Sequence, residues 1–250
     1  MIKLKKSNHG FTVIELIVIL PIVAFIMTSL IVVAQTTFFR ILSNNAEASL
    51  KLESQTALFS LQDELLFATD FGEVKTNDLN DPFQPSGGWR YDTDPDTLII
   101  YETSLNAPRR EPDREFVYKQ IYNCSSPYNP IAVDNVIYFT KDNPDNDYKT
   151  LYRRVLTPQY NTCNNNYRDQ SCPTEANFGT GGCGVVDNKL SDKVVDFEVE
   201  YYDVDNNLVD VDGSGSPLEG EKIKVTLKLG NLVYGKDVEA QSNLTMRKIN

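Results

Sequence analysis

The segment that most limits what this chain can fold into lies near its N-terminus. Leu16 to Ala34 is a run of 19 residues that contains no charge. A helix of that length can cross the ~30 Å hydrocarbon core of a bilayer. Residues 1–10 contain Lys3, Lys5 and Lys6 but no acidic residue, which favours a cytoplasmic N-terminus under the positive-inside rule. We therefore predict a single-pass protein of the cytoplasmic membrane, with everything after residue 35 outside the cytoplasm.

The charge and histidine content argue against several classes of function. The chain has a formal net charge of −11, whereas a nucleic-acid surface needs clustered Lys and Arg. His9 is the only histidine and lies in the basic head, so the remaining chain lacks the commonest general base and metal ligand. We expect no direct nucleic-acid site, no catalytic residue and no enzyme. A membrane-anchored hydrolase that uses paired carboxylates is a third hypothesis, and no motif supports it.

One acidic residue, Glu15, stands at the start of the apolar segment. A carboxylate in a membrane helix is costly unless it reaches the interface or pairs with a cation. Glu15 therefore either lies at the cytoplasmic interface or needs a cationic partner. An ordinary secretory signal would be cleaved after the apolar run at a site of small residues, and the sequence from Gln35 to Phe39 offers none.

The residues around Glu15 form a specific pattern, in which a short basic leader precedes Gly10-Phe11-Thr12-Val13-Ile14-Glu15-Leu16. This pattern resembles the class III signal of type IV prepilins and type II secretion pseudopilins. The resemblance implies that a prepilin peptidase cuts between Gly10 and Phe11 and that the new Phe11 amine is methylated. It also implies that Glu15, then the fifth mature residue, pairs with the methylated amine of a neighbouring subunit.

The same resemblance implies partners, a location and a role. The partners are other pilin or pseudopilin subunits, the prepilin peptidase, the inner-membrane assembly platform and the membrane itself. The chain would lie in the cytoplasmic membrane before assembly and in a cell-surface or periplasmic filament afterwards. Its length favours a minor structural subunit, and Glu15 suggests a position beneath the tip or within the shaft. The alternative is an unprocessed, adhesin-like bitopic surface-binding protein that keeps its lysine-rich head.

A helical pattern extends beyond the membrane segment. Apolar residues recur at intervals of four or seven and form one stripe, made by Phe38, Leu42, Ala46, Leu50, Ala57, Leu61 and Leu65. We expect a helix from Phe11 to Phe67, whose outer half must pack against another element. Pro21 lies earlier than the proline such subunits often carry. Because proline lacks an N–H and clashes with the preceding turn, we expect a kink or a locally melted turn near Ile17–Pro21.

The rest of the chain has the composition and alternation of strands. The expected strands are Thr97–Glu102, Glu115–Tyr122, Val133–Thr140, Leu151–Leu156, Val194–Tyr202, Glu221–Leu229 and Asp237–Arg247. The strands at 194–202 and 221–229 carry acids and lysines respectively on their wet faces, which favours pairing if they are neighbours.

These elements predict an α+β fold, in which a long N-terminal helix packs against an antiparallel β-sheet, as in pilin-like subunits. The first half of that helix spans the membrane. We divide the chain into a leader at 1–10, a transmembrane half of the helix at 11–35, an outer half at 36–70 and an extracytoplasmic β-rich domain at 71–250.

Several polar stretches are expected on the surface. Asp78–Asp96 is rich in turn residues and is interpreted as a loop, with Trp89 within it as a core anchor rather than a ligand platform. Arg109-Arg110-Glu111 and Arg153-Arg154 are interpreted as solvated faces.

The four cysteines, Cys124, Cys163, Cys172 and Cys183, lie in a stretch rich in Asn, Gly and Pro. Outside the cytoplasm an even number of cysteines favours disulfides, and the spacings are poor for zinc. Four cysteines allow three connectivities. We favour Cys163–Cys172 with Cys124–Cys183, because the first pair would close a short polar hairpin.

The stretch from Asp210 to Glu221 has the spacing of a twelve-residue calcium loop. Its oxygen ligands would be Asp210, Asp212, Ser214, Ser216 and Glu221, with Gly215 at the sharp turn. Against calcium, the flanking residues are expected to form strands rather than helices, and Pro217 replaces the usual aliphatic residue. The alternative is a Gly/Ser hairpin loop without a metal. Calcium is the one cofactor that the sequence suggests.

Overall fold

The computed structural model describes residues 12–92, 97–174, 183–209 and 215–248. The chain divides into two compact units, Met1–Ala46 and Glu47–Asn250. The long helix α1 (Val13–Leu65) begins in the first unit and ends in the second. The expected helix to Phe67 is therefore two residues too long, because residues 66 and 67 form a turn before strand β1.

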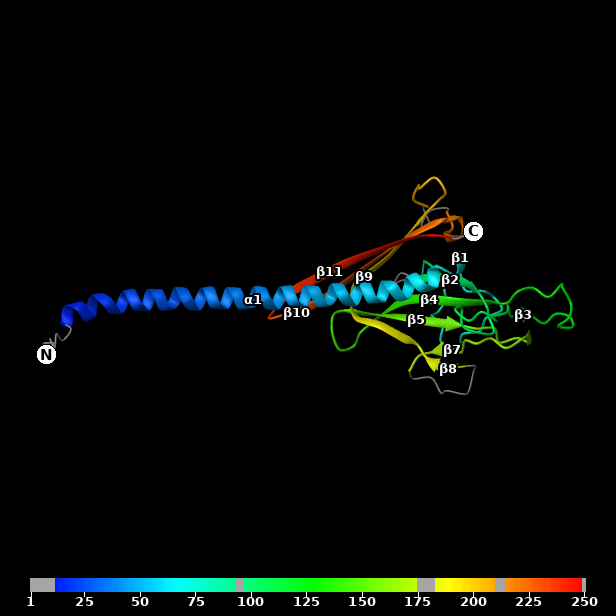
Figure 1. Cartoon of the computed structure of the whole chain (residues 1–250), viewed down its shortest axis with the longest axis horizontal. Helices are drawn as coiled ribbons and strands as arrows, with labels where there is room; N and C mark the ends of the chain where they lie inside the picture. The colour runs from blue at the N-terminus through cyan, green and yellow to red at the C-terminus, as the bar shows by residue number, and fades with distance from the viewer. Residues whose placement is uncertain (1–11, 93–96, 175–182, 210–214, 249–250) are drawn as a thin grey trace, which may run out of the picture. The chain divides into compact units, whose positions relative to one another are not determined.

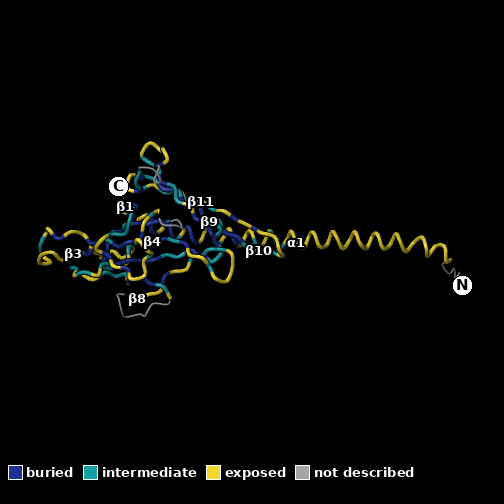
Figure 2. The backbone as a smooth tube through the Cα atoms, turned by 180° about the vertical axis from the view of Figure 1, so that it is seen from behind, coloured by how far each residue is buried: buried dark blue, intermediate teal, exposed yellow. Residues whose placement is uncertain are grey.

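The first unit contains the apolar part of α1, and its side chains are exposed (Figure 2). The helix is long and apolar enough to cross a membrane. Its two mid-segment hydroxyls donate to the helix backbone, Thr28 to the carbonyl of Ala24 and Ser29 to that of Phe25. These bonds satisfy the polar groups within the helix itself, which a lipid environment requires.

The locally melted turn expected before Pro21 is absent, because residues 17–21 are helical without interruption. Proline removes the N–H of a single residue. The backbone bonds of the turns on either side are enough to carry the helix through that position.

The second unit contains a seven-stranded antiparallel sheet, shown in Figure 1. In spatial order its strands are β1 (Ala68–Gly72), β2 (Thr97–Thr103), β4 (Val133–Asp142), β5 (Lys149–Leu156), β9 (Asn188–Tyr202), β10 (Lys222–Val233) and β11 (Lys236–Arg247). Two small pairs flank it, β3 (Tyr118–Lys119) with β6 (Thr162–Cys163), and β7 (Gln170–Cys172) with β8 (Cys183–Val186). A short 3-10 helix, η1 (Pro217–Glu219), precedes β10. The predicted α+β arrangement of helix and antiparallel sheet is confirmed.

The predicted pairing of the two late strands is also confirmed. β9 and β10 are antiparallel neighbours, and Lys224 lies directly opposite Glu200. Their side chains form an ion pair with Nζ and Oε2 2.5 Å apart. Opposite charges at facing positions stabilise such a pair and help to set its register.

The strand predicted at Glu115–Tyr122 is reduced to the two residues of β3. Phe116, which precedes β3, makes an isolated bridge with Leu105, and Tyr118 of β3 itself makes another with Ile131. β3 pairs with β6 and does not join the seven-stranded sheet. Its β-branched and aromatic neighbours therefore form only local bridges and no long ladder.

The second unit buries apolar side chains on both faces of its central strands. The part of α1 after Glu47 buries Leu50, Leu61 and Leu65, as the stripe predicted. On the opposite face, Trp89 from the loop at 73–92 packs with Ile99 of β2 and Ile137 of β4. Trp89 is 5% exposed, so the prediction of a core anchor is confirmed. A sheet covered on both faces explains why these strands read as continuous apolar runs.

Candidate functional sites

The head of helix α1 is a capping box built from Thr12 and Glu15. Glu15 Oε2 accepts hydrogen bonds from Thr12 N at 2.9 Å and from Thr12 Oγ1 at 3.0 Å. In return, the backbone N–H of Glu15 donates to Thr12 Oγ1 at 3.3 Å. Each side chain thereby satisfies an amide or hydroxyl at the helix start, where backbone donors have no partner in the preceding turn.

The sequence analysis did not predict this capping role, although the T-x-x-E spacing from Thr12 to Glu15 is typical of a capping box. The predicted cleavage residues Gly10 and Phe11 lie outside the described residues. Glu15 is exposed, and within the described part of the chain its second carboxylate oxygen accepts no hydrogen bond. Oε2 of Glu15 therefore bonds to the start of the helix, and Oε1 can accept a hydrogen bond from another donor.

All four cysteines form disulfides, but not in the predicted pairs. Cys124 is bonded to Cys163 and Cys172 to Cys183, with Cα–Cα separations of 5.4 and 5.7 Å. The expected Cys163–Cys172 and Cys124–Cys183 pairs are wrong. The expectation rested on closing the shortest loop, whereas strand pairing decides which cysteines meet.

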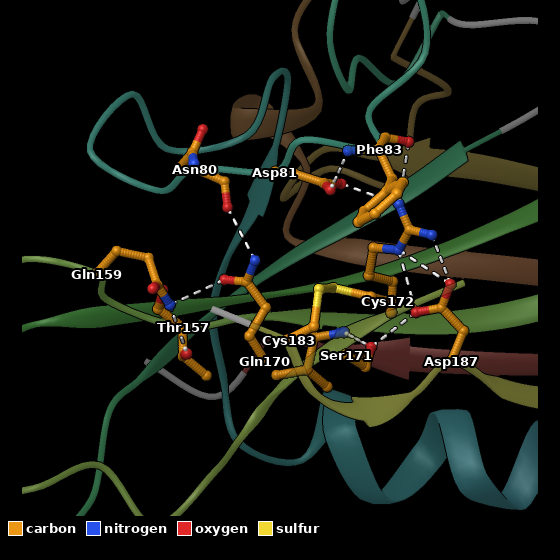
Figure 3. The surroundings of a disulfide bond; sticks show 12 residues. Asn80, Asp81, Phe83, Thr157, Gln159, Gln170, Ser171, Cys172, Cys183 and Asp187 are labelled. Atoms are coloured by element: carbon orange, nitrogen blue, oxygen red, sulfur yellow. Dashed lines mark hydrogen bonds and ion pairs between the residues drawn. A yellow bond between two sulfur atoms is a disulfide. The ribbon is translucent and has the colours of Figure 1, made fainter. Parts of the chain in front are cut away.

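Two small strand pairs bring the cysteines together. β6 ends at Cys163 and pairs with β3, and Cys124 follows β3 by five residues. β7 and β8 lie parallel, and the register places Gln170 beside Cys183 at the start of the pair that also contains Cys172. Figure 3 shows the second disulfide beside Ser171 and Asp187.

Three of the five expected calcium ligands, Asp210, Asp212 and Ser214, lie outside the described residues, whereas residues 215–221 of the predicted loop are described. Ser216 lies before η1, and its Oγ accepts a hydrogen bond from Leu218 N at 3.2 Å. The Ser216 hydroxyl therefore caps this short helix. Within the described ranges no cluster of three acidic, Cys or His side chains could hold a metal ion.

The interpretation of the paired arginines as solvated faces holds only for Arg110, because Arg154 is buried and Arg109 and Arg153 are partly buried. Arg109 and Arg153 lie in a group of charges around the last turn of α1, together with Glu64, Glu102 and Arg168. We call these five residues the helix-end ion cluster. They come from α1, β2, β5 and two loops, so no local sequence pattern could have joined them.

Glu64 of α1 is the centre of the helix-end ion cluster. Its Oε2 lies 3.1 Å from Arg109 Nη2 and 2.9 Å from Arg168 Nη2, and its Oε1 pairs with Arg153. Although burial works to raise it, the guanidinium groups of Arg153, Arg168 and Arg109 hold the pKa of the Glu64 carboxyl below its usual value.

Glu102 is the second carboxylate of the cluster and is 1% exposed. It pairs with Arg109 and with Arg168, whose Nη1 lies 2.5 Å away. Burial, reinforced by the neighbouring Arg168, lowers the pKa of Arg109. Nearby Asp134 is itself buried, and burial raises the pKa of its carboxyl. The five residues of the cluster carry three positive and two negative charges, and Asp134 places a third carboxyl 3.9 Å from Arg168 Nη1. The cluster fixes the end of α1 against the strands beneath it.

A second buried network surrounds Arg154, which follows Arg153 in β5 and so points to the opposite face of the strand. Figure 3 labels Asp81 and Asp187 of this network. Arg154 Nη1 lies 2.9 Å from Asp81 Oδ2, and Arg154 Nε donates to both carboxylate oxygens of Asp187 at 3.1 Å. Trp89 Nε1 donates to the same Asp81 oxygen at 2.6 Å. Ser171 Oγ donates to Asp187 at 2.8 Å.

In the Arg154 network two buried carboxylates compensate one buried guanidinium, which also lies 5.3 Å from the centre of the Trp89 ring. All of its groups are tied to fixed neighbours. This arrangement holds the loop at 73–92 and the β7–β8 pair onto the sheet, and we interpret it as structural.

Comparison with known protein families, with curated proteins and with solved structures finds no match to this chain.

Proposed function

We propose that the chain is a minor structural subunit of a type IV pilus or type II secretion-like filament, released from its leader by cleavage between Gly10 and Phe11. The observation that carries this proposal is the part of α1 that lies in the first unit. It is an apolar helix whose side chains are exposed, and a single carboxylate stands at its start, in a sequence that resembles a prepilin signal.

An apolar helical surface of this extent needs an apolar environment. Every large apolar side chain from Val13 to Val33 is at least 43% exposed in the isolated chain. A bilayer supplies that environment before assembly, and the helices of neighbouring subunits supply it within a filament. A soluble monomer would leave the surface in water.

Glu15 gives the helix a means of docking in register. Its capping bonds use one carboxylate oxygen, which leaves the other for the methylated amine of a neighbouring Phe11. Both disulfides lie in the second unit and suit an oxidising location outside the cytoplasm. These features support the proposed location on the far side of the membrane.

The first test is the mature N-terminus of the protein recovered from native membranes and from sheared filaments. Mass spectrometry should find a chain that begins at methylated Phe11 in both fractions. An intact Met1 would overturn the proposal and favour the unprocessed, surface-binding bitopic protein instead. A cut after residue 34 would identify an ordinary secreted protein.

A further inference from the structure

A shallow depression lies in the loop that follows β3, lined by Gln120, Ile121, Tyr122, Asn123 and Asn161. Its volume is about 490 Å³, and it is open to solvent. In both views the β3 region lies at one end of the second unit, beyond the last turn of α1 (Figures 1 and 2).

The chemistry of this depression is amide-rich, aromatic and uncharged. The side-chain amides of Gln120, Asn123 and Asn161 make no hydrogen bond to any residue in the described ranges, and each offers both donors and an acceptor. Tyr122 is 58% exposed. The nearest lysine, Lys119, is neutralised by an ion pair with Asp78. Nothing in the lining selects an ion.

The depression is also held in one shape, although all five of its lining residues are solvent-exposed. Asn129 is 6% exposed, and its Oδ1 accepts from the backbone N–H groups of Ile121 at 3.1 Å and Tyr122 at 2.9 Å. Its Nδ2 donates to the carbonyl of Asn123 at 3.0 Å. One buried asparagine therefore fixes the backbone of three consecutive lining residues.

The second lining segment is fixed to the first. Gln120 N donates to the carbonyl of Asn161 at 2.9 Å. The disulfide between Cys124 and Cys163 joins the two segments immediately beyond the lining residues. A site ordered before binding loses less entropy when a ligand arrives, which favours even a small ligand.

We propose that this depression binds a neutral glycan through one or two sugar units. Sugar hydroxyls both donate and accept, as the three amides do, and the C–H face of a pyranose packs on the negative face of an aromatic ring such as Tyr122. A protein partner fits less well, because protein interfaces are centred on desolvated apolar anchors, whereas three of the five residues here are amides.

The test uses the full chain in lipid nanodiscs and biolayer interferometry. The probes are albumin conjugates that carry lactose, cellobiose or N,N′-diacetylchitobiose, with unmodified albumin as the reference. At least one conjugate should bind above the reference. Tyr122→Ala and Asn161→Ala should each weaken that binding about tenfold in Kd, as the loss of one good contact does.

These variants separate recognition from folding. Asn161→Ala keeps the backbone carbonyl that accepts from Gln120, and Tyr122 is exposed, so near-UV circular dichroism should be unchanged. Tyr234→Ala, which removes a 70% exposed tyrosine from the β10–β11 turn, should bind as the wild type does. The proposal is overturned if no conjugate exceeds albumin, or if the two variants bind normally. Tyr122-dependent binding of unmodified albumin would also overturn it, by identifying a protein-docking surface.

Discussion

Replacing Glu64 by glutamine removes the central charge of the helix-end ion cluster while keeping the size of the side chain. Removing one partner of a buried ion pair typically costs ~3–5 kcal/mol. Arg109 and Arg168 retain Glu102, so only Arg153 loses the sole carboxylate it pairs with among the described residues. We therefore expect the lower end of that range, about 3 kcal/mol less free energy of unfolding.

The assay is urea unfolding of the full chain in mild detergent, followed by tryptophan fluorescence. Trp89 is the only tryptophan and is buried in the second unit, so it reports on the part of the chain that holds Glu64. With a slope of ~2 kcal/mol per molar urea, the midpoint should fall by about 1.5 M. Glu47→Gln, an exposed position on the same helix, should change it by less than ~0.3 M.

The pH dependence gives a second, independent check. The pKa of Glu64 is lowered by folding, so its contribution is present above the unfolded pKa of ~4.3 and is lost as the pH falls through the folded value. Asp134, with a raised pKa, acts in the opposite sense in both proteins. The stability difference between wild type and Glu64→Gln should therefore shrink below about pH 4. A midpoint shift under ~0.5 M at pH 7 would refute the stabilising role of the helix-end ion cluster. A stability difference between the two proteins that does not depend on pH would refute it as well.

Three further predictions follow from the other sites. Glu15→Ala should leave cleavage and membrane insertion normal but deplete the subunit in sheared filaments relative to membranes, whereas Glu47→Ala should not; equal recovery would reduce Glu15 to a capping residue. Non-reducing peptide mapping should recover the two disulfides described above and no alkylatable thiol in native protein; any other linkage would contradict the strand pairing. Asp81→Asn should lower the free energy of unfolding by ~2–4 kcal/mol, because Arg154 then keeps only Asp187 as a charged partner. An unchanged urea midpoint would show that the Arg154 network does not stabilise the fold.

The long helix and the main strands could be predicted because each is a local pattern. The apolar run, the outer stripe through Leu50, Leu61 and Leu65, and the facing charges of β9 and β10 all depend on residues a few positions apart. The disulfide pairing could not be predicted in this way. It depends on two short strand pairs whose partners lie tens of residues apart, β3 with β6 above all.

Arg153 and Arg154 show where a local interpretation fails. Adjacent residues of a strand point to opposite faces, so a strand with one wet face would solvate one of the two arginines. Here α1 covers one face of β5 and the loop at 73–92 covers the other, and each arginine must find carboxylates on its own side. Arg153 meets Glu64 and Arg154 meets Asp81 and Asp187. The double arginine in an otherwise apolar strand was thus a signal of two buried faces, because an unpaired guanidinium in either would be too costly to retain.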